Sequence, residues 1–234
     1  GENTMKIVVC IKQVPDTKGG VKFNPDGTLD RGAMLAIMNP DDKAGLEAAL
    51  KLKDEFGAEV TVLTMGLPKA EEVLREALAM GADKGILVTD RVLGGADTWA
   101  TSTTIAGALR NLDYDLIITG RQAIDGDTAQ VGPQIAEHLG IPVISYAQEI
   151  KVDGDAVIVK RQYDDGSYFQ PLTNNFGNSF GGNAVICSLV IMHHEGIEQF
   201  TLFVKNALVL FGCFHPCSYV HAFLYRSSSG KKTM

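Results

Sequence analysis

The stretch DLIITGRQAIDGDTAQVGPQIAEHLG, residues 115–140, joins an apolar run to an amphipathic one through a long polar loop. The run 115–120 is short and β-branched, as in a buried strand of a parallel sheet, and the part after Asp127 has the three- and four-residue apolar spacing of a helix. A strand-to-helix connector needs only a few residues and one cap. The additional glycines, acids and threonine therefore indicate a loop that holds a ligand, although an elaborate but empty loop would have the same composition.

The same alternation of strand and helix patterns runs from Lys6 to about Ser145. It predicts an α/β fold, a parallel sheet with helices on both faces. The expected strands are 6–14, 59–66, 84–90 and 115–120, and the expected helices are 39–57, 67–83, 97–113 and the segment after Asp127. Two further stretches, 21–30 and 149–166, contain the turn sequences NPDG and DGD and predict hairpins, the second an antiparallel extension beyond the core.

Charge and composition narrow the classes of partner and compartment. The 234 residues carry a net charge of −7 at pH 7, which disfavours binding to the phosphate backbone of a nucleic acid. A bound small nucleotide is compatible with this charge. The N-terminal apolar stretch is too short for a signal peptide, so we expect a cytoplasmic protein that starts naturally at Met5.

The loop 120–133 follows the carboxyl end of its strand, where open α/β sheets bind ligands. Asp127 and Gln130 have the spacing of a capping box, and Gly126 would let the backbone approach a ligand closely. Pro133 fits a first helical turn that begins near Val131. Such a start leaves the amides of Thr128, Ala129, Gln130 and Val131 free to face an anion, most naturally a phosphate.

Other polar and aromatic positions have two interpretations each. Asn39 can contact an adenine or ribose edge or cap the helix that Pro40 begins, with Asp41 and Asp42 near the positive helix end. Gly66 can admit a base or serve a turn. Trp99, next to the expected cap Asp97, packs in a core more often than on a flavin, and paired acids such as Asp125 and Asp127 are caps more often than magnesium ligands.

The familiar catalytic motifs are missing from the α/β part of the sequence. No GxGxxG follows the first strand, and residues 5–166 contain neither GxxxxGK[ST] nor GxSxG. His138 is the only histidine before residue 193, so the α/β part offers no acid–base or nucleophilic constellation. The pattern favours a protein that holds a nucleotide over a hydrolase, with no metal site.

The strings MKIVVCIKQVPD (5–16), NPDDKAGLEAALKLKDEFGAEVTVLTMG (39–66), ALAMGAD (77–83) and TGRQAIDGDTAQVGPQIAEHLGIP (119–142) resemble the β subunit of electron transfer flavoproteins. The resemblance extends from Met5 to about Gly166. It implies a fold similar to adenine nucleotide α-hydrolases and an α subunit as partner. Ordinary members hold AMP in this subunit. The string GDTAQVGP instead resembles the electron-bifurcating members, which hold FAD there and pass electrons from NADH to an acyl-CoA dehydrogenase-type protein and to ferredoxin or flavodoxin.

The resemblance also implies which residues bind the cofactor. The phosphate side would be Asp127, Thr128, Ala129, Gln130, Val131 and Gly132, and the adenosine side would be Cys10, Asn39, Asp41, Thr64, Met65 and Gly66. FAD is the expected cofactor and AMP the alternative. The isolated chain would be an electron-carrier subunit without complete turnover. A competing class is an adenine-nucleotide-binding module of the stress-protein kind, which would bind no flavin and need no α subunit.

The composition changes abruptly after Gly166. Residues 167–234 hold six charged side chains but 11 aromatic ones, and three of the four cysteines. We therefore divide the chain into a nucleotide-binding domain, 5–166, and an atypical segment, 167–234, to which the pattern assigns no structure. A frameshift, a gene-model error or a fusion would each account for the change, which puts the partner contacts of this segment in doubt.

Overall fold

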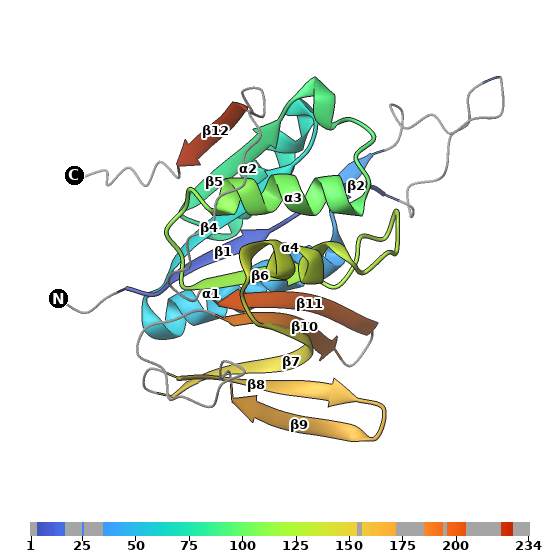
Figure 1. Ribbon diagram of the computed structural model, residues 1–234. Coiled ribbons are helices and arrows are strands. Elements are labelled where there is room, and N and C mark those ends of the chain that lie inside the picture. The colour runs from blue at the N-terminus through green and yellow to red at the C-terminus, as the bar shows by residue number, and fades with distance from the viewer. Residues whose placement is uncertain are drawn as a thin grey trace, which may run out of the picture.

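Four parallel strands form the centre of the main sheet in this computed structural model (Figure 1). In spatial order they are β5 (Lys84–Thr89), β4 (Glu59–Met65), β1 (Lys6–Cys10) and β6 (Leu116–Gly120). β1 pairs in parallel with β4 on one side and with β6 on the other. The chain therefore reverses its direction of winding at β1, and β1 and β6 flank the switch point at which open α/β sheets bind ligands.

Helices cover both faces of these strands, as the sequence predicts. α1 (Pro40–Phe56) and α2 (Glu71–Met80) lie on one face, and α3 (Thr98–Leu109) and α4 (Val131–Leu139) lie on the other (Figure 1). Side chains of β1 alternate between the two faces. Ile7 belongs to the same apolar cluster as Leu46 of α1, and Val8 to the same cluster as Ile135 of α4. The alternation of β1 thus builds two cores, one on each side of the sheet.

Short elements complete the connections between strands and helices. The 3-10 turns η2 (Pro68–Ala70) and η3 (Arg91–Leu93) precede α2 and α3. The expected strand 6–14 is broken, because β1 ends at Cys10 and a separate strand β2 (Gln13–Pro15) pairs antiparallel with β3 (Ala36–Met38). The predicted hairpin 21–30, apart from Pro25, lies outside the residues that the structure describes.

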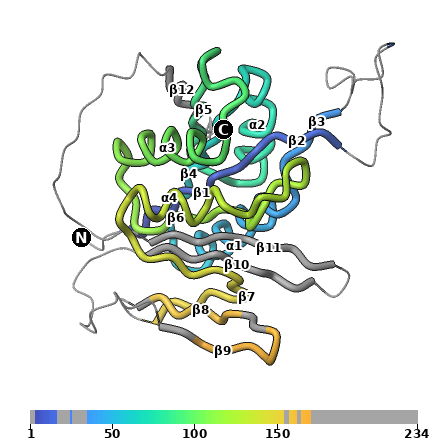
Figure 2. The backbone as a smooth tube through the Cα atoms, turned by 45° about the vertical axis from the view of Figure 1, so that its right-hand side comes forward, coloured from blue at the N-terminus to red at the C-terminus, as the bar shows by residue number. Residues whose placement is uncertain are grey.

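An antiparallel extension continues the main sheet away from β5 (Figure 2). β7 (Val143–Asp153) pairs with β8 (Ala156–Tyr163), which pairs with β9 (Gly166–Pro171). The predicted hairpin 149–166 is therefore confirmed. The register of β7 against β8 shifts between Ala147 and Glu149, as it does at a β-bulge.

Strands from the atypical segment join the same sheet. β11 (Gly196–Val204) pairs antiparallel with β6, and β10 (Val185–His193) lies between β11 and β7. β12 (His221–Arg226) pairs antiparallel with β5. The sequence pattern had assigned no structure here, and the division of the chain at Gly166 stays a prediction. The structure describes residues 4–16, 25, 35–153, 156–171, 185–193, 196–204 and 221–226.

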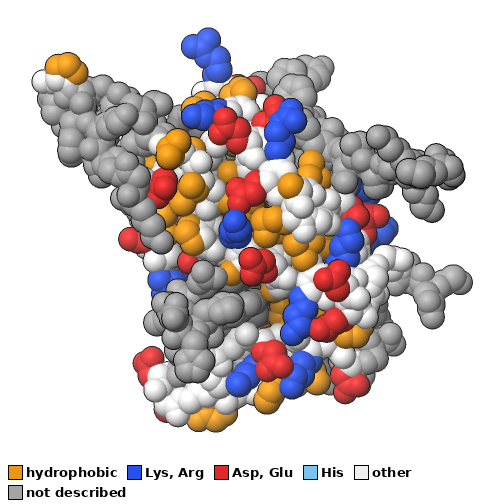
Figure 3. Space-filling view, turned by 180° about the vertical axis from the view of Figure 1, so that it is seen from behind, with side chains coloured by type: hydrophobic (Ala, Val, Ile, Leu, Met, Phe, Trp, Pro, Cys, Tyr) orange, Lys and Arg blue, Asp and Glu red, His pale blue; other side chains and the backbone are white. Residues whose placement is uncertain are grey.

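The surface of the described residues mixes both signs of charge. On the face seen in Figure 3, Lys and Arg side chains lie next to Asp and Glu side chains, with apolar groups between them. No helix among the described residues is long and apolar enough to span a membrane.

Candidate functional site

A cavity of about 390 Å³ opens at the carboxyl ends of the parallel strands. This volume is within the range of small-molecule sites. Its wall includes residues that follow β1, β4, β5 and β6, so it lies at the switch point of the sheet. Ten of the twelve predicted site residues line it, namely Cys10, Asn39, Met65, Gly66, Asp127, Thr128, Ala129, Gln130, Val131 and Gly132. Asp41 and Thr64 are buried but do not belong to the wall.

Asn39 ties helix α1 to the loop that follows β6. One of its two interpretations was a cap of α1, but its side chain makes no capping hydrogen bond although the residue occupies the N-cap position. Instead, its Nδ2 donates to the carbonyl oxygen of Gln122 at 2.8 Å, and its Oδ1 accepts from the amide of Ile124 at 3.1 Å. The residue is fully buried. Asn39 therefore fixes the backbone of this loop, and that tertiary use replaces the local cap.

Asp42 joins the ends of two neighbouring strands. Its Oδ2 accepts from the amide of Lys12 at 2.8 Å, and its Oδ1 accepts from the amide of Gly120 at 3.0 Å. A Cβ atom on Gly120 would lie 2.2 Å from Asp42 Oδ1, so this contact requires glycine. Burial raises the pKa of Asp42 to about 7, while hydrogen bonds from Asn39 and from the two amides act to lower it.

The loop between β6 and α4 holds two residues in the left-handed region. Asp127 has φ 50° and Ala129 has φ 52°, a conformation that costs free energy in residues with a side chain. The capping-box prediction is wrong, because α4 begins at Val131 and Asp127 Oδ1 instead accepts from Gln122 Nε2 at 2.9 Å. The start of the helix near Val131, predicted from Pro133, is confirmed.

The strained loop leaves backbone donors unpaired. Within the described part of the chain, the amides of Thr128, Ala129, Gln130 and Val131 donate to no protein acceptor. Consecutive free amides at the start of a helix form a site for an anion. Backbone strain of this kind persists where the surrounding structure enforces it, often at ligand sites. The local geometry is therefore that of an anion cradle.

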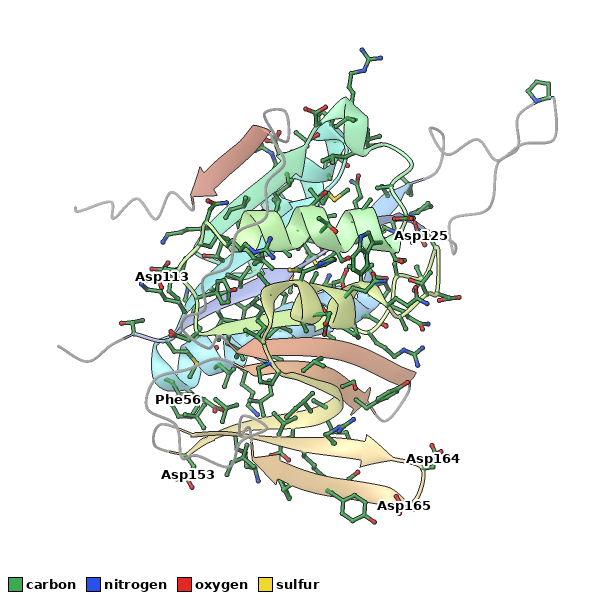
Figure 4. The ribbon with its side chains drawn as sticks, in the orientation of Figure 1. Phe56, Asp113, Asp125, Asp153, Asp164 and Asp165 are labelled. Atoms are coloured by element: carbon green, nitrogen blue, oxygen red, sulfur yellow. The ribbon has the colours of Figure 1, made fainter. Side chains whose placement is uncertain are left out.

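Two cationic side chains stand in the wall of the cavity. Lys12 Nζ forms an ion pair with Asp125 at 2.7 Å, and Figure 4 shows Asp125 on the loop that follows β6. Arg121 directly follows β6, and its Nε is buried without a hydrogen-bond partner. The sequence pattern did not predict Arg121, Lys12 or Asp42 as site residues. The signal available for Lys12 and Arg121 was their place immediately beyond the carboxyl ends of strands.

The remaining predicted positions are mostly apolar or buried. Burial, with a smaller contribution from the charge of Asp42, raises the pKa of the Cys10 thiol far above its ordinary value, so this group stays neutral. A Cβ on Gly66 would approach that of Ala70 to 3.0 Å, which gives Gly66 a packing reason besides any ligand. The hydroxyl of Thr64 is buried and has no partner.

Trp99 of α3 and His138 of α4 form an aromatic pair. The expectation that Trp99 packs in a core is wrong, since 58% of the residue is exposed. Its ring meets that of His138 edge-on with centroids 4.4 Å apart, and His138 Nε2 lies 3.1 Å from the hydroxyls of Ser102 and Thr103. The predicted cap at Asp97 is confirmed by its bond from the amide of Ala100 at 2.8 Å. No cluster of metal-ligating side chains occurs among the described residues.

A family profile described as "Electron transfer flavoprotein domain" matches residues 26–174, which include the anion cradle and α4. The chain belongs to the electron transfer flavoprotein family. Within this family of electron carriers it resembles the β subunits, among them "Electron transfer flavoprotein subunit beta" of Clostridium acetobutylicum, with 58% identity over 163 residues. That alignment covers 69% of this chain and 62% of the relative. The resemblance stated from the sequence motifs is thereby confirmed.

Two further relatives are named as parts of reductase complexes. "Acryloyl-CoA reductase electron transfer subunit gamma" of Anaerotignum propionicum is 60% identical over 165 residues, covering 69% of this chain and 62% of that protein. "Caffeyl-CoA reductase-Etf complex subunit CarD" of Acetobacterium woodii is 56% identical over 165 residues, covering 69% of this chain and 63% of that protein. This chain thus spans less than two thirds of the length of these relatives.

Proposed function

We propose that this chain is a cytoplasmic β subunit that binds FAD and, with an α subunit, bifurcates electrons. The observation that supports it most is the anion cradle, the four unpaired amides of residues 128–131 in a loop strained at Asp127 and Ala129. The FAD diphosphate is an anion of the kind that such amides bind. Arg121 lines the same cavity as the cradle, and its buried Nε has no hydrogen-bond acceptor in the protein.

The residues present fit an adenine dinucleotide. In this proposal residues 127–132, which include the anion cradle, hold the phosphates. The adenosine side of the wall is formed by Cys10, Asn39, Met65 and Gly66. Asp41 and Thr64 support that side from behind the wall, where the structure buries them. A flavin bound there supplies one- and two-electron chemistry. The chain itself contributes binding, orientation and shielding from water.

The relatives favour a role within a larger assembly. Two of them are named as parts of acyl-CoA-type reductase complexes. We therefore propose that the heterodimer accepts two electrons from NADH and delivers one to an acyl-CoA dehydrogenase-type protein and one to ferredoxin or flavodoxin. The isolated chain would oxidise no NADH, since the route to the acceptors runs through the partners.

The test is the nucleotide content of the assembled protein. The chain would be co-expressed with an electron transfer flavoprotein α subunit from the same genome and purified. The protein would then be denatured, and the released nucleotides identified and counted by chromatography. Two FAD per heterodimer is the expected result. One FAD with one AMP would make this an ordinary electron carrier. An adenine nucleotide without flavin, from a chain that does not bind the α subunit, would instead assign the chain to the stress-protein-like class.

A further inference from the structure

We propose that Arg121 is a ligand-binding residue, whose guanidinium binds the phosphate oxygens of the nucleotide in this cavity. The inference rests on the proposed function in so far as the ligand is a nucleotide. Arg121 follows β6 directly and lines the cavity. Its Nε is buried, with no hydrogen-bond partner in the protein. A buried donor without an acceptor costs free energy, and a ligand oxygen would remove that cost.

The acidic side chains of the cavity wall are bonded to other groups, so the Arg121 guanidinium is available to bind an anion. The acidic residues of the wall all accept hydrogen bonds from the protein; they are Asp42, Asp90, Asp97 and Asp127. Lys12, the other cation of the wall, is paired with Asp125. Within the described residues, Arg121 is the wall cation that has no ion pair. An anionic ligand in this cavity therefore has one uncommitted positive charge to meet.

The backbone on both sides of Arg121 is held in place. The amide of Gly120 donates to Asp42, and the carbonyl of Gln122 accepts from Asn39. Both bonds come from the first residues of α1 or its N-cap, so one helix end fixes the two neighbours of Arg121. A backbone held in this way fixes the point from which the Arg121 side chain extends, which reduces the entropy lost on binding.

The shape of the guanidinium selects the kind of ligand group. Its planar fork of N–H donors matches two oxygens of a phosphate, and a lysine at this place would offer only a point charge. The four free amides of residues 128–131 belong to the same loop. We therefore assign Arg121 and the anion cradle to one phosphate group or to the two phosphates of one diphosphate.

The experiment uses the co-expressed heterodimer, stripped of nucleotide, and compares Arg121→Gln with wild type by titration calorimetry. ADP, adenosine and inorganic phosphate are the probes. Arg121→Gln should weaken ADP binding about tenfold or more, because it removes a charge-assisted bond. Adenosine binding should change less than about twofold, because adenosine lacks the phosphate. Arg121→Lys should recover part of the loss, and raising the salt concentration should narrow the difference between variants.

Arg75→Gln is the matched control. Arg75 lies on α2, its side chain is 72% exposed, and it pairs with Glu71 outside the cavity wall. This change should leave all three affinities unaltered. The proposal would be overturned if Arg121→Gln left ADP binding intact, or if it weakened ADP and adenosine equally, since equal loss indicates a structural effect.

The outcomes also separate Arg121 from the identity of the cofactor. If ADP binds through Arg121 but the purified heterodimer retains AMP in place of a second FAD, the role of Arg121 stands and the FAD assignment fails. If wild-type heterodimer with two FAD shows no dependence of ADP affinity on Arg121, the FAD assignment stands and the role of Arg121 fails. Inorganic phosphate that competes with ADP in wild type, but not in Arg121→Gln, would support the phosphate contact directly.

Discussion

Replacing Gly120 by alanine should test whether the close packing of Gly120 against Asp42 costs more to disturb than the usual replacement of a glycine. The new Cβ would stand 2.2 Å from Asp42 Oδ1 and 3.0 Å from the amide nitrogen of Asp42. Real Cβ atoms do not approach another atom to 2.2 Å, and a contact of 3.0 Å with a backbone nitrogen is at the limit of what they show. The Asp42 carboxylate must therefore turn away, or β6 or the start of α1 must move. Any such movement lengthens the 3.0 Å bond from the amide of Gly120 to Asp42.

The size of the effect follows from two contributions. At pH 8, where Asp42 is mostly charged, its hydrogen bond from Gly120 contributes about 1.5–3 kcal/mol, and forcing an extra methyl group into a packed site costs about 1–3 kcal/mol. We therefore expect Gly120→Ala to lower the free energy of unfolding by about 2.5–6 kcal/mol. This loss is large compared with the stability of a typical domain.

Gly107→Ala provides the control. Gly107 lies within α3, and nothing is within 4 Å of the place where its Cβ would be. Alanine in a helix interior is favoured over glycine, so this variant should gain about 0.5–1 kcal/mol. Urea unfolding followed by circular dichroism and by the fluorescence of Trp99, the chain's one tryptophan, measures both. If the two variants differ from each other by less than about 1 kcal/mol, the junction at Gly120 lacks the tightness assigned to it.

Three further outcomes test the site. Burial raises the pKa of Asp42 from 3.8 to about 7, so the stability this group contributes below pH 4 is lost as pH rises to 7. Asp42→Asn loses one of the two bonds from the amides of Lys12 and Gly120 and should be less stable than wild type at pH 4, but the difference in unfolding free energy should shift in its favour by up to about 4 kcal/mol between pH 4 and pH 8 in urea titrations; parallel profiles would contradict this. Cys10, buried and neutral, should be alkylated at pH 8 only after unfolding, as peptide mass mapping would show. Ala129→Gly relieves a positive φ, so the free energy of unfolding in the same assay should stay equal or rise by up to about 1 kcal/mol; a decrease would mean that the loop is not strained there.

The layers of the fold follow from local patterns in the sequence. β6 was predicted from a run of apolar residues that the structure buries completely, and α4 was placed near Val131 by the demands of Pro133. These signals are local, because periodicity and helix starts depend on residues a few positions apart. For the same reason, local patterns are enough to predict helices on both faces of the sheet without knowledge of long-range contacts.

Long-range partners explain what the pattern missed at the site. Asn39 and Asp42 were interpreted as contributors to the helix end, which is the frequent use of such residues. Their real partners lie far along the chain, Gln122 at 83 residues from Asn39 and Gly120 at 78 from Asp42. A cap and a tertiary junction have the same local sequence. Only the packing of α1 against the end of β6 distinguishes them.

The segment after Gly166 was beyond the reach of the pattern for a different reason. Its few charged side chains leave long apolar stretches without the alternation that assigns a strand to a face. Strand partners also depend on position in the sheet: β11 pairs with β6, and β12 pairs with β5, across large separations in the chain. Composition marked the boundary, but it carried no information on pairing.

The two roles assigned to the start of α1 and to Arg121 predict different coupling between stability and binding. Asp42 and Asn39 hold the backbone on either side of Arg121, so changes there should lower stability and nucleotide affinity together. Arg121 has an unpaired buried donor in the free protein, so its loss should reduce affinity for phosphate-bearing ligands and leave stability unchanged or higher. In this cavity the residues that build the site and the residue that binds the anion are therefore distinct, and one helix end positions both the cation and the strained loop that follows it.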